Sequence, residues 1–151
     1  MTTLSAPVSD PSALRARVEA SLARQGMMQH LGVRLLSVAP GHVVVALPYS
    51  DRVSQQQGGF HGGAMGALAD IAGGYAALTV APQGMEITTV EYKINFLAAF
   101  QSGELEAAGR VVRAGQRIIV TTAEVMHIAA DGQRRVAAVM QQTLVPVPPT
   151  Y

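Results

Sequence analysis

Asp70 is the residue of this sequence best suited to do chemistry, because it is the single charged side chain in a long apolar segment. The segment runs from Phe60 to Ala81 and is rich in Ala, Gly and Leu. A buried carboxylate without a partner is costly, and such groups are often functional. The chemistry open to it is activation of a water molecule as a general base. The alternative is a carboxylate that is merely salt-bridged where two helices touch.

The start of the same segment offers a second chemical group, the backbone amide of Gly62. Residues 58–63 read Gly-Gly-Phe-His-Gly-Gly, and a helix that begins there has free N–H groups that suit a developing oxyanion. Gly62 and Asp70 are therefore candidate halves of an acyl-transfer site. Eight residues of helix separate them by about 12 Å along the axis and by roughly 80° around it. One chain cannot aim both at one carbonyl, so we expect two copies to pair with antiparallel helices.

The face of the predicted helix that carries Asp70 is lined by the smallest side chains. Gly63, Gly66, Gly74 and Ala77 share this face by helical spacing. Interior glycines cost a helix about 0.8–1.0 kcal/mol each relative to Ala, so another backbone or a slim ligand must need the space. The other faces carry larger side chains that we expect to pack into a curved sheet, namely Met65, Leu68, Ile71, Tyr75 and Leu78.

The flanking segments must position this helix, and their patterns predict an α+β fold. Asp10 and the proline after it mark the start of a short amphipathic helix over Pro11–Gln25. Two runs rich in β-branched residues, Leu31–Val38 and His42–Pro48, flank the Pro-Gly turn at residues 40–41 and predict a hairpin. A polar loop follows at Asp51–Gly59. After the long helix, four strand-like runs predict an antiparallel meander: Glu86–Ala98, Glu104–Arg113, Arg117–Ala129 and Arg134–Val145.

The whole chain is predicted to form one domain, a curved antiparallel sheet wrapped around one long central helix. A length of 151 residues fits a single core. We expect a flexible tail over residues 1–10, the domain over 11–146 and a second tail over 147–151. The prolines near the C-terminus cannot extend a central strand and are expected to mark the end of the domain.

The composition narrows the classes of partner. Charged residues make up 14% of the chain, against roughly 25% in an ordinary soluble protein, which indicates a surface covered by another subunit. The net charge is +1 and the sequence has no run of Lys or Arg, so it does not predict the basic surface that nucleic-acid-binding proteins have. The absence of Cys excludes disulfides, thiolate catalysis and zinc–thiolate sites. No uninterrupted apolar stretch reaches the ~20 residues that span a membrane, so we expect a cytoplasmic protein.

Residues 59–63 (Gly-Phe-His-Gly-Gly) and 68–72 (Leu-Ala-Asp-Ile-Ala) together resemble the hotdog-fold thioesterases of the phenylacetate-pathway type, within the 4-hydroxybenzoyl-CoA thioesterase superfamily. The run from Thr88 to Phe96 also fits, and the likeness covers about Leu31 to Val145. The resemblance implies hydrolysis of acyl-CoA thioesters to the free acid and CoA, without a metal or a separate cofactor. We expect a homodimer, and a dimer of dimers, that is a homotetramer, is the larger assembly that the sequence leaves open.

The resemblance also implies roles for four residues. In that family the acid of the helix acts as general base or nucleophile, a role that falls on Asp70, and the amide after the motif histidine polarises the thioester carbonyl, a role that falls on Gly62. Gln55 matches a loop amide that orients the water or carbonyl, where many relatives have Asn instead. Thr89 matches a hydroxyl on the strand after the helix.

Further residues are predicted to bind substrate. His61 and Gly63 lie in the motif itself, and His61 is expected to orient or to support the structure, because no Gly-x-Ser-x-Gly sequence accompanies it. Phe60 and Tyr75 are candidates for an acyl pocket, and ordinary core packing is the alternative for both.

The arginines and the remaining histidines give weaker signals. Arg113 and Arg117 bracket a strand turn and could meet the nucleotide phosphates of CoA, although such arginines usually face water. His30, His42 and His127 have no metal-ligand spacing, so no metal site is predicted.

Two other functions compete with hydrolysis. A hydratase or dehydratase on the same fold typically needs a His paired with the acid, and here His61 lies nine residues from Asp70. A non-catalytic acyl-CoA-binding module would keep the pocket and lack turnover, and fold alone cannot separate it from an enzyme.

Overall fold

The computed structural model describes residues 10–149, so the expected tails fall largely outside it, at residues 1–9 and 150–151. Helices and strands follow the predicted α+β order with two short additions, α2 and the 3-10 turn η1. In chain order the elements are α1 (Pro11–Leu22), α2 (Gly26–Leu31), β1 (Arg34–Ala39), β2 (His42–Pro48), η1 (Asp51–Val53), α3 (Gly62–Val80), β3 (Glu86–Phe96), β4 (Glu104–Ala114), β5 (Ile119–Ile128) and β6 (Arg134–Val147).

The N-terminal helix starts as predicted and ends earlier. The Asp10 carboxylate accepts a hydrogen bond from the amide of Ser12 and caps α1, with Pro11 at the first helical position. The separate helix α2 was not predicted, because six residues are too few to show a helical period. Its one sequence signal is Gly32, which ends the helix at a φ of 83°.

The six strands form one antiparallel sheet in the order β1-β2-β4-β5-β6-β3. The expected meander is correct for β4, β5 and β6 and wrong for β3, which lies at the far edge beside β6. The connection over residues 97–103 is too long for a tight hairpin, so β3 and β4 need not be neighbours. β3 is therefore an edge strand, and only one of its sides is paired.

The last strand runs through Pro146 to Val147, two residues beyond the predicted strand Arg134–Val145. Pairing between β5 and β6 stops at Leu144, whereas pairing between β3 and β6 continues to Val147. The proline thus lies where β6 has one neighbour instead of two, and such a position tolerates a missing N–H.

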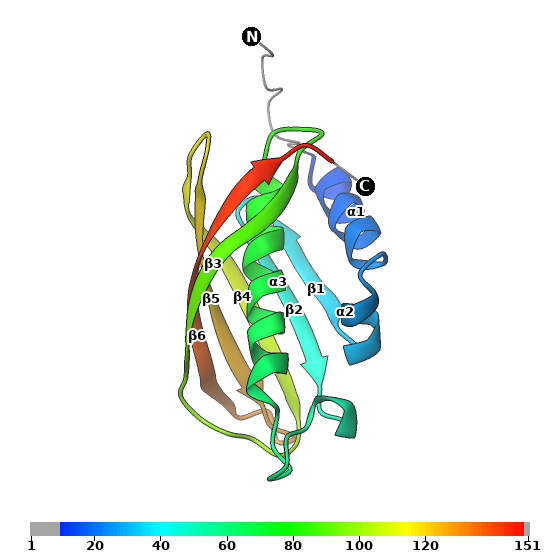
Figure 1. Cartoon of the computed structure of the whole chain (residues 1–151). Helices are drawn as coiled ribbons and strands as arrows, with labels where there is room; N and C mark the ends of the chain where they lie inside the picture. The colour runs from blue at the N-terminus through cyan, green and yellow to red at the C-terminus, as the bar shows by residue number, and fades with distance from the viewer. Residues whose placement is uncertain (1–9, 150–151) are drawn as a thin grey trace.

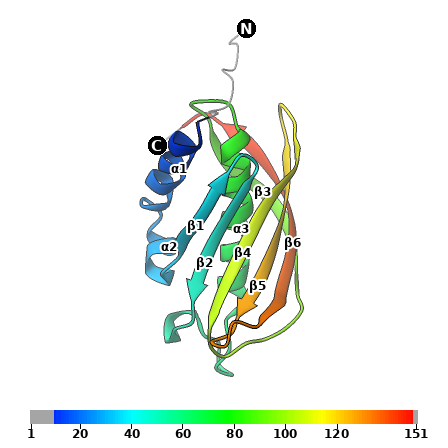
Figure 2. The same ribbon diagram turned by 180° about the vertical axis from the view of Figure 1, so that it is seen from behind.

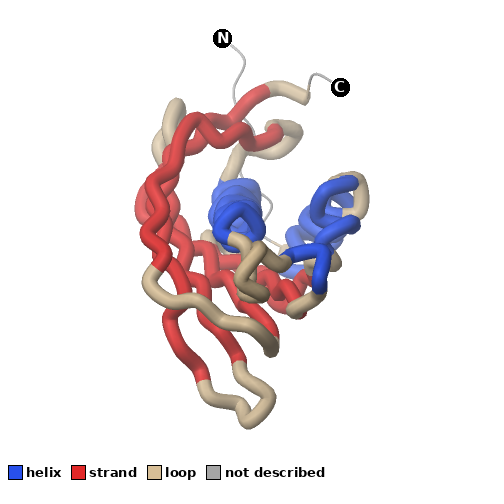
Figure 3. Tube along the Cα trace, turned by 60° about the horizontal axis from the view of Figure 1, so that its bottom comes forward, coloured by secondary structure: helices blue, strands red, loops and turns tan. Residues whose placement is uncertain are grey.

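The sheet curls around α3, which lies along its concave face (Figure 1). The view from behind shows the convex face of the sheet, with β2 and β4 passing in front of α3 (Figure 2). Viewed near the helix axis, the strands surround α3 on one side, and α1 and α2 lie beside it on the other (Figure 3). α3 is long and apolar enough to span a membrane by composition, but 67% of its apolar window is buried inside the fold. It is the core helix that the sequence predicts.

Small residues let α3 lie unusually close to the sheet. Ala69, Ala72, Gly73 and Ala76 are buried beside the predicted core residues Met65, Leu68, Tyr75 and Leu78. A Cβ added to Gly109 of β4 would lie 2.1 Å from the carbonyl oxygen of Ala72, a distance that no side chain allows. The helix was expected to be rich in glycine to make room for a second chain or a ligand. At least Gly73 serves instead the packing of α3 against the sheet of its own subunit.

Candidate active site

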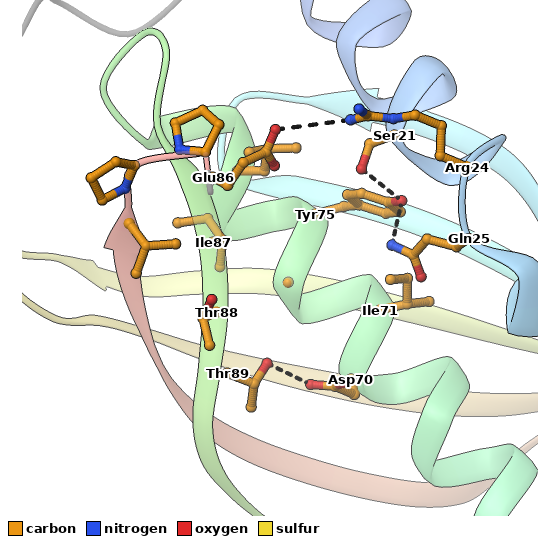
Figure 4. Close-up of a pocket in the computed structure, with 15 residues that line it drawn as sticks. Ser21, Arg24, Gln25, Asp70, Ile71, Tyr75, Glu86, Ile87, Thr88 and Thr89 are labelled. Carbon is orange, nitrogen blue, oxygen red and sulfur yellow. Dashed lines mark hydrogen bonds and ion pairs between the residues drawn. The ribbon is translucent and has the colours of Figure 1, made fainter. Parts of the chain in front are cut away.

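Asp70 lies halfway along α3, and its carboxylate is held at one oxygen. The hydroxyl of Thr89 on β3 donates to Oδ1 at 2.8 Å, as Figure 4 shows. The side-chain Nε2 of Gln142 on β6 donates to the same Oδ1, also at 2.8 Å. Within residues 10–149, the other oxygen, Oδ2, has no hydrogen-bond partner. The acid is thus fixed in one orientation and keeps one oxygen free to act.

A cavity of about 890 Å³ opens beside this carboxylate. It lies between the end of α1, the second half of α3 and the first part of β3, and Asp70 and Thr89 form one part of its wall (Figure 4). The neighbouring wall is apolar and comes from Ile71, Leu78 and Ile87. An apolar cavity next to a polar reactive group is the usual form of a small-molecule site.

Tyr75 brings polar groups to the same cavity. Its side chain is 3% exposed, and its hydroxyl accepts from Nε2 of Gln25 at 2.9 Å and donates to the hydroxyl of Ser21 at 3.3 Å. Burial raises the pKa of the Tyr75 hydroxyl above its ordinary value, so the group stays neutral and keeps its proton. Arg24 and Glu86 form an ion pair at 4.0 Å across the rim.

The start of α3 carries the predicted amide donor. The His61 ring caps the helix, with Nδ1 accepting from the amide of Gly63 at 2.8 Å. The amide of Gly62 has no acceptor in the part of the chain that the structure describes, and the Phe96 ring lies 3.3 Å from the position of an added Cβ. His61 therefore has a structural role here, and the Gly62 N–H remains available.

The loop before α3 holds Gln55 and Phe60. The Gln55 amide oxygen accepts from the backbone N–H of Gln57, and its own backbone closes a turn with Gly59. Phe60 is buried and packs edge-on against Tyr49, with ring centroids 5.1 Å apart. Neither residue lines the cavity at Asp70, so Phe60 is a core residue of this subunit.

Arg113 and Arg117 lie apart from Asp70, where β4 turns into β5. Together with Gly115 and Ile118 they border a separate hollow. The subunit therefore brings Asp70, Thr89 and Tyr75 together in one cavity, and leaves Gly62 two turns away on the same helix. Among residues 10–149, no three His, Asp or Glu side chains come close enough to form a metal-ligand set.

Gln142 is the site residue that sequence reasoning missed. A signal was available, because inward positions of β6 alternate and Met140, Gln142 and Leu144 are all buried. An amide in the middle of an apolar inward row indicates a specific polar partner.

Comparison with known proteins shows which family the chain resembles. The sequence model of the thioesterase superfamily matches residues 57–129, which include the start of α3 and Asp70. The chain is 30% identical over 92 residues to a 1,4-dihydroxy-2-naphthoyl-CoA hydrolase of Listeria monocytogenes, a match that covers 60% of this chain and 74% of the relative.

Many solved structures are similar to this chain, and two of them illustrate the likeness. A thioesterase family protein from Silicibacter pomeroyi has a TM-score of 0.85 and 34% identity, over 90% of this chain and 99% of that one. The E. coli PaaI protein from the phenylacetic acid degradation operon has a TM-score of 0.81 at 21% identity, over 93% and 97% of the two chains, and shows the fold alone. The chain therefore belongs to the thioesterase superfamily and has the hotdog fold, with its curved antiparallel sheet around one long helix.

Proposed function

We propose that the protein hydrolyses acyl-CoA thioesters to the free acid and CoA, with Asp70 as the reactive acid. Membership of the thioesterase superfamily supports thioester hydrolysis in general. The observation that carries the finer proposal is the Asp70 carboxylate, held at Oδ1 by two donors while Oδ2 stands free beside a cavity. The hydrolase name of the Listeria relative supports a CoA thioester as the substrate.

In the proposed reaction Oδ2 of Asp70 acts on the thioester carbonyl in one of two ways. As a general base it takes a proton from water, which attacks the carbonyl carbon, and the C–S bond breaks to release CoA. As a nucleophile it attacks the carbon itself, the C–S bond breaks to release CoA, and water then cleaves the mixed anhydride that has formed. In both cases the Gly62 amide polarises the carbonyl oxygen, a contribution of ~3 kcal/mol for one oxyanion donor. Thr89 holds the acid, and Gln55 is assigned to orienting the water or carbonyl.

We propose that each site is shared by two subunits. Gly62 and Asp70 of one chain lie two turns apart on α3, so the amide that faces Asp70 comes from a partner. The least covered face of α3 consists of Gly63, Ala67, Asp70, Ile71 and Gly74, and its small side chains leave room for a second helix. The adjacent edge strand β3 exposes Val90, Tyr92 and Phe96 at 60%, 46% and 51%. These exposed apolar groups support a homodimer, and the proposed assembly is a dimer of dimers.

The acyl group is assigned to the cavity beside Asp70, with Tyr75 in its wall. His61, Gly63 and Phe60 are assigned to the thioester end of the substrate, the first two at the start of α3 and Phe60 by packing behind it. Arg113 and Arg117 are assigned to the nucleotide phosphates, since their guanidinium groups lie exposed at the β4–β5 turn. The predicted cytoplasmic location remains a prediction.

The test of the chemistry is a thiol-release assay with short aliphatic, medium-chain and aromatic CoA esters, on wild type and Asp70→Asn. General-base catalysis contributes about 10²- to 10⁴-fold, so the variant should lose that factor in kcat while its melting temperature stays near the wild-type value. Hydration of crotonyl-CoA, measured in parallel, identifies a hydratase. Equal rates for the two proteins would remove Asp70 from the mechanism, and tight binding without thiol release would indicate a binding module.

The test of the shared site is complementation between two inactive variants, Asp70→Asn and Gly62→Pro. Proline removes the N–H of residue 62 but suits the first position of a helix, and His61 already has the extended backbone (φ −69°, ψ 135°) that a following proline requires. Gly62→Ala keeps the N–H and serves as the matched control.

Refolding the two inactive variants together should restore about a quarter of the wild-type rate, because half of the dimers are mixed and one of their two sites is intact. A site contained within one subunit would show no recovery. A monomer in light scattering would also contradict the proposal.

A further inference from the structure

Gln142 is a fully buried polar residue in the middle of the sheet. Its side chain is 0% exposed, and it points from β6 toward α3 between two apolar neighbours, Met140 and Leu144. β6 is paired on both sides, with Thr121 of β5 and Tyr92 of β3 as the cross-strand partners of Gln142. Water does not reach the amide, so every polar contact it makes is a contact with protein.

The amide nitrogen of Gln142 serves Asp70. Nε2 lies 2.8 Å from Asp70 Oδ1, 3.4 Å from the Asp70 backbone oxygen and 3.5 Å from the Thr89 hydroxyl oxygen. An ionised carboxylate only accepts hydrogen bonds, so the NH₂ end of the amide must face it. Gln142 and Thr89 therefore hold the same carboxylate oxygen from two different strands.

The other end of the amide carries a cost that opposes the stability gained from its hydrogen bond to Asp70. Within residues 10–149, Oε1 of Gln142 and the hydroxyl oxygen of Thr121 are both buried without a hydrogen-bond partner. A buried acceptor without a partner costs free energy, and an apolar residue of the same size would avoid that cost. The side chain thus keeps one unpartnered oxygen, and the hydrogen bonds that it makes go to Asp70 and Thr89.

Gly73 supplies the space that the amide needs. A Cβ added to Gly73 would lie 1.7 Å from Gln142 Oε1 and 2.7 Å from the Thr121 hydroxyl oxygen. Any side chain at position 73 would push the amide out of its place beside Asp70. Gln142 can therefore occupy its place only because residue 73 is glycine.

We propose that Gln142 is a positioning residue, which fixes Oδ1 of Asp70 so that Oδ2 is presented to the thioester or to the attacking water. Thr89 alone leaves the carboxylate free to turn about its one remaining hydrogen bond. Two donors from two strands define its plane, and reaction rates depend steeply on such alignment. This inference rests on the proposed function, since it assigns Gln142 a part in the reaction of Asp70.

The test compares Gln142→Met with Gln141→Met. Methionine has similar length and volume and lacks the amide, and Gln141 is the exposed neighbour on the same strand. For Gln142→Met we expect kcat to fall about 10- to 100-fold, with KM within about twofold of wild type. Its melting temperature should stay near the wild-type value, because the loss of the hydrogen bond to Asp70 and the removal of the unpartnered oxygen oppose each other. Gln141→Met should match wild type in all three measurements.

A second measurement separates positioning from damage to the fold. Gln142→Met placed in the Asp70→Asn background should leave the residual rate unchanged, because the group that it positions is already lost. A further loss of the same factor would mean that Gln142 acts on the fold in general and would overturn the inference. A wild-type kcat for Gln142→Met would overturn it as well. If Asp70→Asn itself keeps wild-type activity, the proposed function fails instead, so the two failures can be told apart.

Discussion

The two faces of α3 use small residues for different purposes. On the face toward the sheet, Ala72 and Gly73 touch backbone and buried side chains of β4, β5 and β6, so that a single added methyl group has no room. On the open face, a Cβ added to Gly74 would meet nothing closer than a Leu144 methyl carbon at 3.9 Å. The first face is small because the subunit is tightly packed. The second has room that its own subunit does not fill.

Asp70 lies on the open face, and its supports come from elsewhere. Thr89 reaches it from the edge strand β3, and Gln142 reaches it from β6 past Gly73. The close approach of helix and sheet is what brings Gln142 within hydrogen-bond distance of the acid. The packing of α3 against the sheet therefore sets the position of the Asp70 carboxylate on the open face.

The largest expected effect comes from adding one methyl group where the sheet packs against α3, at Gly109 of β4. The matched addition is at Gly74, on the open face of α3. Gly109→Ala places a Cβ 2.1 Å from the Ala72 carbonyl oxygen and 2.5 Å from the Gly73 nitrogen, so we expect a loss of about 3 kcal/mol or more in the free energy of unfolding. Gly74→Ala, the matched change on the open face, should unfold at the same denaturant concentration as wild type or a higher one, because Ala favours a helix. Urea unfolding curves measure both. Equal stability of the two variants would abolish the distinction between the faces.

An intermediate effect is expected at Thr89, which connects the edge strand to the acid. Thr89→Val removes the donor and keeps the shape, and a hydrogen bond to a charged group contributes about 1.5–3 kcal/mol, so kcat should fall at least about tenfold. Thr89→Ser retains the hydroxyl and should keep most of the activity. Steady-state thiol release measures the pair. Equal loss in both variants would assign Thr89 to packing instead of hydrogen bonding.

The smallest effect is expected at His42, at the start of β2 in the sheet and away from Asp70. Burial, followed by the charge of its cross-strand neighbour Arg110, holds the pKa of His42 below its ordinary value of 6.5. The unfolded chain therefore binds a proton more readily, so the contribution of His42 to stability is present above about pH 6.5 and is lost as the pH falls below that value.

The matching measurement is the melting temperature between about pH 7.5 and 5. Wild type should lose more stability over this range than His42→Gln, while both proteins hydrolyse thioesters at the same rate at pH 7.5. Parallel melting curves for the two proteins would show that His42 does not titrate in this way.

Much of the fold follows from local patterns in the sequence. α3 and Asp70 are recognisable because one charge among apolar residues is rare, and the bounds of β2 and the starts of β3, β4 and β6 follow from turn residues and alternation. The place of β3 beside β6 does not follow, because strand order depends on how a long connection crosses the end of the sheet. Helix α2 is too short to show a period.

The site is harder to predict from the sequence than the fold, because its contacts also depend on the strand order. A place for Thr89 in the active site was expected through a family resemblance. The Gln142–Asp70 contact, in contrast, joins residues 72 positions apart across a strand order that was not predicted. The distance between Asp70 and the two arginines, Arg113 and Arg117, also depends on the whole sheet. The spacing of residues along the sequence predicts neither the Gln142–Asp70 contact nor the distance from Asp70 to the two arginines.

The position of β6 in the sheet has a consequence for how the protein folds. This strand comes last among the described elements, yet it is inserted between β5 and β3. Until it joins, β3 has no neighbour in the sheet, and Asp70 lacks the Gln142 donor and a fixed position for Thr89. A folding intermediate without β6 would keep Asp70 on its helix but leave the carboxylate unaligned, so the catalytic geometry proposed for Asp70 is completed in the same step that closes the sheet.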